Sequence, residues 1–391
     1  MTKGQRGFLA GAIAGVVAAV ALLSLVGPLQ DLLPETRSQS RSDEARQVIE
    51  DSYFRETDPG ELDNASISGM VKQISRANED KFSHYFDPST YARFQQSTSG
   101  EFSGIGLSVG AAKRGLRVSM VFADTPAERA GIATGDLITR VGDKSLAGVG
   151  PTAAASQIKG PPGTKVTITV VDGKTGRERD LEVERANVKI PSVQSKMKHL
   201  GGHRIGYVSL AGFTRGAHGE LRDAIAGLLR DGAEGLVFDL RNNGGGLLDE
   251  GVLVASIFQD SGPVVTIQGR ERDKQTLGAT GDALDTGPVA VLVNGNTASA
   301  SEIVTAALKE NDLATVVGTR TYGKGVFQEV IPLDAGGALD LTVGEYLTAD
   351  GTSILGKGVV PDERVVDPDP SDGDEVLDAG LAAVRSELKG S

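Results

Sequence analysis

The order of apolar and polar positions divides the chain into segments with different expected structures. The run Phe8 to Gly27 has 20 residues with Ser as its only polar residue, long enough for a membrane-spanning helix. A polar stretch with helical periodicity follows, with helices expected at Ala45–Phe54 and Ile67–Ala77. We therefore expect a cytoplasmic stub and transmembrane anchor over residues 1–34 and a helical arm over residues 35–100.

The remaining chain shows two further patterns. Short alternating or β-branched runs, separated by Gly and Pro, predict a small β-barrel with two short helices over residues 101–186. From residue 187 to 366 apolar strands alternate with helical stretches, which is typical of an α/β core. Residues 367–391 are expected to form an acidic linker and a C-terminal helix. The core strands expected are Arg204–Val208, Gly235–Leu240, Pro288–Val293 and Ala314–Val317, and the core helices are Gly219–Arg230, Leu247–Phe258 and Ser299–Asn311.

Two interpretations of the N-terminal apolar run remain. Ala19-Val20-Ala21 fits the small-x-small cleavage site of a secretory signal peptide. The apolar run continues through Leu22 to Val26, which favours an uncleaved anchor, and Lys3 and Arg6 before it favour a cytoplasmic N-terminus. The expected location is the cell membrane with the folded part outside the cytoplasm, and the alternative is a secreted or periplasmic protein.

Composition narrows the chemistry. The 391 residues include 40 Lys and Arg against 52 Asp and Glu, and this net charge of −12 argues against a nucleic-acid partner. There is no Cys, which excludes disulfides, thiolate catalysis and Cys-based metal sites. The four His residues lie beside no nucleophile motif, and no H-E-x-x-H sequence occurs. If the protein is a hydrolase, the remaining candidate for a general base is lysine.

One candidate nucleophile lies at a strand-to-helix turn. A buried strand ends at Asn294-Gly295, and Ser299 follows at the start of a helix, where unpaired amides stabilise negative charge. The spacing Ser299-x-x-Glu302 is equally a capping box, which requires no catalytic role.

A candidate base is Lys324, which lies between Gly323 and Gly325. The segment nearly matches a phosphate-binding loop, but Gly325 lacks the hydroxyl that would ligate magnesium, and a strand-like pattern follows in place of a helix. Burial can lower a lysine pKa from about 10.4 towards about 7–8, where the neutral amine accepts a proton. An exposed turn lysine is the alternative.

A third segment could supply hydrogen-bond donors. The strand that ends at Leu240 leads into Gly244-Gly245-Gly246, and such glycine runs can present backbone amides to an oxyanion. A flexible strand–helix connection is the alternative.

Taken in order, these segments resemble the carboxyl-terminal processing peptidases, or tail-specific proteases, from about Ile49 to Leu388. The run Asn296 to Ile303 matches their nucleophile motif and selects Ser299, not Ser301. Lys324 stands in the family's T-[FY]-G-K-G context, and Gln328 matches the glutamine that orients the lysine. The resemblance implies a serine-type endopeptidase with a Ser–Lys dyad, no metal and no cofactor.

The resemblance also covers the glycine segment. Asp239 to Gly246 is similar to the family sequence D-L-R-x-N-P-G-G, with Gly244 in place of the usual proline. By this resemblance the amides of Gly245 and Ala300 form the oxyanion hole. Glu310 aligns where some members have aspartate and is given no role.

Residues 104–183 resemble a PDZ domain. The resemblance implies that Gly104, Ile105, Gly106 and Leu107 bind the terminal carboxylate of a substrate, whose tail adds to the sheet as a strand. The fold class expected is an α/β protease core of crotonase- or Clp-like βαβ layers with an inserted PDZ β-barrel, an N-terminal helical arm and one N-terminal transmembrane helix.

The expected function is therefore an extracytoplasmic endopeptidase that recognises protein C-termini through its PDZ domain. A catalytically inert PDZ scaffold is the alternative, and a crotonase-like acyl-transfer enzyme is disfavoured by the PDZ unit. The expected partners are proteins and peptides bound by their C-termini and, through the N-terminal helix, a membrane. A homo-oligomer is left open.

Overall fold

The computed structural model describes residues 40–98, 100–189, 191–366 and 373–390. They divide into two compact units, one that ends at Ile74 and one that begins at Ser75. The first unit holds helix α2 (Arg41–Ser52) and most of α3 (Pro59–Ala77). Both helices were predicted from periodicity, and Ser40 caps α2 with a hydrogen bond from Asp43 N to Ser40 Oγ of 3.2 Å.

The prediction of an N-terminal transmembrane helix is corrected. Within the described residues no helix is both long enough and apolar enough to cross a membrane. The longest of them, α3, has 19 residues and carries Glu61, Asp63, Lys72 and Arg76 among its apolar positions, and charged groups are costly in a bilayer core. The apolar run at Phe8–Gly27 lies outside the described residues.

The predicted small β-barrel is present as a sheet in the order β3-β4-β5-β7-β8, with β6 paired to β5. Aliphatic residues such as Leu116, Ile138 and Ile168 fill its core. Its entry and exit strands, β2 and β9, pair antiparallel. The elements are β2 (Glu101–Gly104), β3 (Leu107–Ala112), β4 (Gly115–Val121), α5 (Pro126–Arg129), β5 (Leu137–Val141), β6 (Lys144–Ser145), α6 (Pro151–Ile158), β7 (Lys165–Val171), β8 (Glu178–Glu184) and β9 (Ala186–Lys189).

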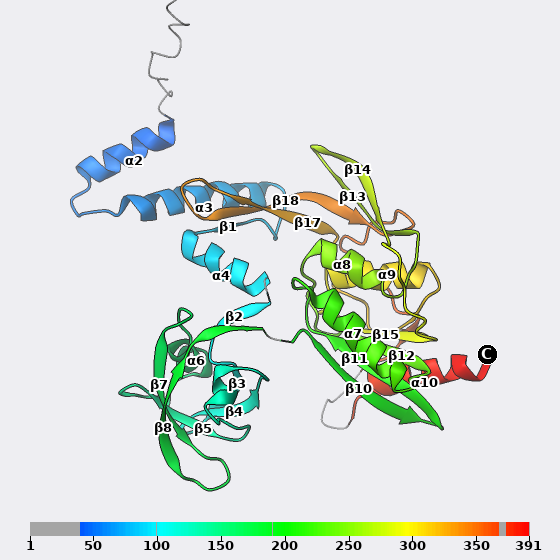
Figure 1. Cartoon of the computed structure of the whole chain (residues 1–391). Helices are drawn as coiled ribbons and strands as arrows, with labels where there is room; N and C mark the ends of the chain where they lie inside the picture. Colours follow the sequence, from blue (N-terminus) through cyan, green and yellow to red (C-terminus); the bar gives the residue numbers. More distant parts are fainter. Residues whose placement is uncertain (1–39, 99, 190, 367–372, 391) are drawn as a thin grey trace, which may run out of the picture. The chain divides into compact units, whose positions relative to one another are not determined.

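The α/β core is built on a six-stranded sheet in the order β10-β11-β12-β15-β16-β19 (Figure 1). All neighbours run parallel except the β10–β11 pair, and the strands and helices expected from the sequence are confirmed within a few residues at each end. The elements are β10 (Val193–Leu200), β11 (His203–Leu210), α7 (Ala217–Arg230), β12 (Gly235–Asp239), α8 (Leu248–Ala255), β15 (Val289–Val293), α9 (Ala300–Glu310), β16 (Thr315–Gly318), β19 (Glu363–Arg364) and α10 (Glu375–Gly390).

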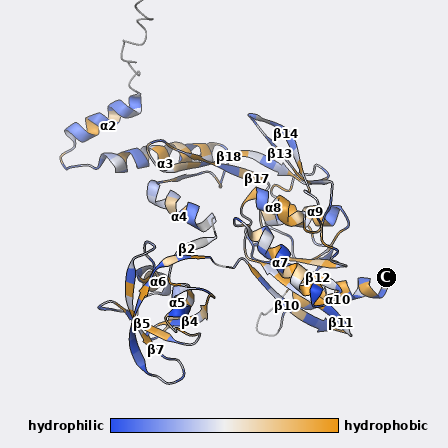
Figure 2. Cartoon of the chain, viewed as in Figure 1, coloured by the Kyte–Doolittle hydropathy of each residue, from blue (hydrophilic) through white to orange (hydrophobic). Residues whose placement is uncertain are grey.

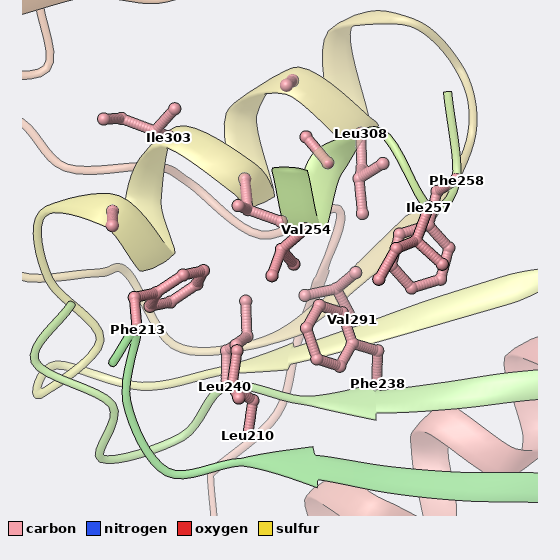
Figure 3. Packing of buried hydrophobic residues seen from close by; sticks show 14 of the residues in the cluster. Leu210, Phe213, Phe238, Leu240, Val254, Ile257, Phe258, Val291, Ile303 and Leu308 are labelled. Atoms are coloured by element: carbon pink, nitrogen blue, oxygen red, sulfur yellow. The ribbon is translucent and has the colours of Figure 1, made fainter. Parts of the chain in front are cut away.

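Helices cover both faces of this sheet. Phe238 and Val291 point to the face covered by α7, α8 and α9 and belong to the same buried cluster as Ile303 and Leu308 (Figure 3). Alternate residues such as Val237 point to α10. Figure 2 shows hydrophobic residues concentrated on α8, whereas β10 is largely hydrophilic. Because both faces are buried, the central strands read as continuous apolar runs.

In a second sheet, the long strand β18 pairs with β1 and β13 along one edge and with β17 along the opposite edge. Strand β14 pairs with β13. Strand β1 comes from the segment before the PDZ-like unit, and its His84 is paired in register with Asp340 of β18. Helix α4 (Pro88–Thr98) connects β1 to β2. The strands are β1 (His84–Phe86), β13 (Pro263–Gly269), β14 (Arg272–Gly278), β17 (Val326–Pro332) and β18 (Ala338–Leu347).

Candidate active site

Ser299 lies at the turn between β15 and α9, directly before the first residue of that helix. Its backbone has φ 58° and ψ −122°, a conformation that L-residues rarely adopt and that the surroundings must hold in place. Gly245 packs against this turn so closely that a Cβ atom there would lie 2.7 Å from Ser299 Cβ and 2.9 Å from Ala300 N. Ser299 as a whole is 5% exposed.

Glu302 holds the turn that carries Ser299 and the loop that carries Lys324. Its fully buried carboxylate accepts hydrogen bonds from Ser299 N at 2.9 Å and Lys324 N at 2.9 Å. Gly323 N at 2.7 Å and Thr321 Oγ1 at 2.5 Å also donate to it. The capping-box interpretation is therefore correct for the Glu302 carboxylate, which in addition fixes a second loop.

The ammonium of Lys324 lies over the ring of Phe82, with Nζ 5.1 Å from the ring centroid. Burial lowers the pKa of Lys324, and the negative charges of Asp340 and Glu302 oppose that shift without cancelling it. Among the described residues no hydrogen bond joins Lys324 Nζ to Ser299 Oγ, although both side chains line one cavity.

Gln328 lies on β17 opposite Thr342 of β18. Its Nε2 donates to Thr342 Oγ1 at 3.0 Å, and Thr342 Oγ1 donates to Asp80 Oδ1 at 3.1 Å. Asp80 belongs to the turn that precedes β1, so a segment far away in the sequence contributes to the surroundings of Gln328.

Tyr346 is a buried polar neighbour of Ser299. Burial raises the pKa of its phenol to about 12, and a hydrogen bond with the Ser299 side chain opposes that shift. Its ring lies against Phe327, with 5.3 Å between the ring centroids. A neutral phenol at this position can donate a hydrogen bond as well as accept one.

The two predicted oxyanion amides lie beside Ser299. Ala300 is the first residue of α9, where backbone amides have no acceptor within the helix. The amide of Gly245, however, donates to Asn243 Oδ1 at 2.9 Å, so this donor is already engaged. A Cβ atom at Gly244 would have no neighbour within 4 Å, so no other group occupies the space of the family's usual proline.

The cavity that Ser299 and Lys324 share has a volume of about 650 Å³. Leu248, Ile267 and Phe327 form apolar parts of its wall. It lies at the carboxyl ends of the parallel strands, where ligands bind in open α/β sheets.

A second cavity, of about 700 Å³, also lies near the sheet edge but holds none of the predicted site residues. Its charged groups are paired with one another: Arg241 binds Asp239 at 2.7 Å and Asp374 at 2.6 Å. No cluster of three or more His, Asp or Glu residues that could hold a metal ion occurs in the described part of the chain.

The PDZ-like unit has a narrow groove beside Gly104 to Leu107. The groove has a volume of about 40 Å³, and Ile158 and Lys159 close its other side. Gly106 has φ 87°, and a Cβ there would lie 2.2 Å from Thr125 Cβ, so only glycine fits. Strand β3 is the end strand of its sheet within the described residues, which leaves an edge to which a peptide strand can add.

Several residues around the candidate site were missed by sequence reasoning. Glu302 was noticed through its capping-box spacing, which gave no sign that it also binds the lysine loop. Asp80, Phe82 and Thr342 carried no recognisable signal, because only the pairing of β1 and β17 with β18 brings them close to Gln328 and Lys324.

Comparisons with known proteins show the family and the PDZ domain. The model of Peptidase family S41 matches residues 204–365, and the PDZ domain model matches residues 93–171. A probable CtpA-like serine protease of Staphylococcus aureus (strain COL) is 34% identical over 360 residues, which cover 91% of this chain and 71% of the relative. One of Staphylococcus saprophyticus is 35% identical over 325 residues, covering 82% of this chain and 64% of the relative.

Solved structures give the same result. The photosystem II D1 C-terminal processing protease is 28% identical, with a TM-score of 0.50, and the match covers 88% of this chain and 95% of that one. An S41 protease from Bacteroides fragilis NCTC 9343, at 17% identity and a TM-score of 0.53 over 92% of this chain and 100% of that one, shares the fold.

Proposed function

The chain belongs to peptidase family S41, and on that premise we propose that it is a serine endopeptidase in which Ser299 is the nucleophile and Lys324 the general base. Family membership and the serine protease relatives support the serine-type assignment. The observation that carries the dyad is that Ser299 and Lys324 line one cavity, each on a loop bound to the carboxylate of Glu302.

The proposed reaction begins when neutral Lys324 accepts the proton of Ser299 Oγ, which attacks the peptide carbonyl carbon. The tetrahedral intermediate collapses as Lys324 gives that proton to the leaving amine, and an acyl-enzyme remains. Water then attacks the acyl group, with Lys324 again taking and returning a proton. The lowered pKa of Lys324 supports this role, because a base must be neutral near the working pH.

The first step requires a movement within the site. Lys324 Nζ, which lies 5.1 Å from the centroid of the Phe82 ring, must come within about 3 Å of Ser299 Oγ. The amides of Ala300 and Gly245 are proposed to stabilise the oxyanion, and Gly245 must then exchange its bond to Asn243 for one to the substrate.

The PDZ-like unit is proposed to bind substrate C-termini. The groove between β3 and α6, with Lys159 at its rim, suits a peptide that adds as a strand and ends in a carboxylate. We propose residues 101–186 as the extent of this domain and 187–366 as that of the protease core.

A location outside the cytoplasm is proposed from the sequence alone. Lys3 and Arg6 before an uncharged apolar run are typical of a secretory signal peptide. Recovery of the protein outside the cytoplasm, with its N-terminus at Leu22, is the expected result. Cytoplasmic protein that retains the apolar run would contradict this proposal.

An inert PDZ scaffold remains a second candidate, because Ser299 and Lys324 are not hydrogen-bonded to each other in the described structure. Casein cleavage separates the two functions. We expect the wild type and Ser301→Ala to cleave casein, and Ser299→Ala and Lys324→Ala to lose that activity. Full activity in either of the last two variants would overturn the proposed dyad.

A further inference from the structure

The segment before the PDZ-like unit reaches the base side of the candidate active site. Asp80 lies in the turn that leads into β1, which pairs with β18. Its Oδ1 accepts hydrogen bonds from Phe82 N at 2.8 Å and Ser83 N at 3.3 Å, so the carboxylate organises its own turn. Ser83 Oγ accepts a hydrogen bond from Thr342 N at 2.9 Å, which links the turn to β18.

Asp80 determines how Thr342 uses its hydroxyl group. Burial raises the pKa of Asp80, but hydrogen bonds from Ser83, Phe82 and Thr342 together lower it below its usual value. The ionised carboxylate can only accept, so Thr342 Oγ1 must donate its one proton to Asp80, at 3.1 Å. The lone pairs of Thr342 Oγ1 are then left as acceptors for a neighbouring donor.

That neighbour is Gln328, whose Nε2 donates to Thr342 Oγ1 at 3.0 Å. A glutamine side chain has a donor end and an acceptor end, and only the donor end satisfies a hydroxyl that already gives its proton away. The amide orientation thus follows from the chemistry of Asp80 and Thr342. With Nε2 bound to Thr342, the carbonyl oxygen of Gln328 is the end available to accept a hydrogen bond from Lys324 Nζ.

We propose that Asp80 and Thr342 are positioning residues. They fix the side-chain amide of Gln328 so that its oxygen can accept a hydrogen bond from Lys324 Nζ. The inference rests on the proposed function, since it gives Gln328 a purpose only if Lys324 is the base. The same turn places the ring of Phe82 next to the Lys324 ammonium, and Asp80 holds that turn through the amide of Phe82.

Replacement of Thr342 tests this inference. Thr342→Val keeps the shape of the side chain and removes the hydroxyl, and we expect kcat for a peptide substrate to fall at least about ten-fold with KM nearly unchanged. Thr342→Ser should restore kcat to within about two-fold of the wild type, because a serine hydroxyl can make the same hydrogen bonds to Asp80 and Gln328. Thr276→Val is the matched control, since it removes a threonine hydroxyl bond elsewhere in the same sheet and should leave kcat unchanged.

A double-mutant cycle separates positioning from general stability. In a Gln328→Ala background, Thr342→Val should cause no further loss, because the amide that it orients is absent. An equal loss in that background would overturn the inference.

Asp80→Asn gives an independent test if Thr342→Val unfolds. Its introduced amide can donate to Thr342 Oγ1, so the threonine proton can turn to Gln328 and favour the reversed amide. A similar loss of kcat is expected.

Different results would overturn the positioning role of Asp80 and Thr342 and the Ser299–Lys324 dyad. Suppose that Ser299→Ala and Lys324→Ala are inactive. Wild-type kcat in Asp80→Asn or in folded Thr342→Val would then overturn the positioning role and would not affect the proposed dyad. Activity in Ser299→Ala or Lys324→Ala would overturn the dyad itself.

Discussion

The backbone amides of Ser299 and Lys324 donate hydrogen bonds to the same oxygen atom, Oε2 of Glu302. One buried charge thereby sets the separation of the two loops that carry the proposed nucleophile and base. Positioning of this kind matters because a displacement of about 1 Å between reacting groups can cost about a hundred-fold in rate.

Glu302→Gln is therefore expected to be far more harmful than its small change in size suggests. The new amide group would face donors that it cannot satisfy, at a cost of about 1–3 kcal/mol in the free energy of unfolding. Thermal melting and cleavage of a peptide substrate, with activity lowered at least about ten-fold, would show both effects.

Glu310→Gln on the same helix is the matched control. Glu310 accepts one hydrogen bond, from Asp350 N at 3.1 Å, in an exposed setting. The Glu310→Gln substitution should alter the melting temperature and the cleavage activity little. An equal loss of stability and activity in Glu302→Gln and Glu310→Gln would contradict the special role of Glu302.

Gly245→Ala should disturb the nucleophile directly. At φ 96°, a Cβ would lie 2.7 Å from both Ser299 Cβ and Ala298 O, so the nucleophile turn or the glycine loop must shift. We expect the unfolding free energy to fall by about 1–3 kcal/mol and cleavage to drop at least about ten-fold. Gly244→Ala, where nothing lies within 4 Å, should resemble the wild type in both measurements.

The pH profile of kcat/KM tests the charge state of Lys324. If the neutral amine is the active form, kcat/KM rises with pH as Lys324 loses its proton. The charge of Asp340 favours the ammonium, so Asp340→Asn should lower the pKa of Lys324 and move the rising limb to lower pH. His84 and Asp80 also act on Asp340 and are unchanged in this variant. A limb that stays in place would show that another group titrates.

The groove of the PDZ-like unit should bind peptides only through a terminal carboxylate. Gly106→Ala would force a Cβ to within 2.2 Å of Thr125 Cβ and should weaken binding at least about ten-fold in a fluorescence anisotropy titration. Gly110→Ala, on the strand β3 that directly follows Gly106, meets nothing within 4 Å and should bind like the wild type. Equal affinity for a peptide and its C-terminal amide would contradict carboxylate recognition.

The sequence predicts the parts of this fold that depend on local patterns. The buried strands β12, up to its last residue Asp239, and β15 are continuous apolar runs, and Ser299 and Lys324 each lie within a short motif that is complete in itself. The environment of the base was not predictable in this way. Asp80 and Thr342 meet across 262 residues of chain, and only the pairing of β1 with β18 brings them together.

The central claim is that Ser299 is the nucleophile and that Lys324 activates it. The most direct measurement is reaction of the wild-type protein with a serine-reactive fluorophosphonate, followed by mass spectrometry of the digested adduct. We expect one phosphonylated serine, Ser299, with labelling abolished in Ser299→Ala and slowed at least about a hundred-fold in folded Lys324→Ala. An adduct on Ser301, or undiminished labelling of Lys324→Ala, would contradict it.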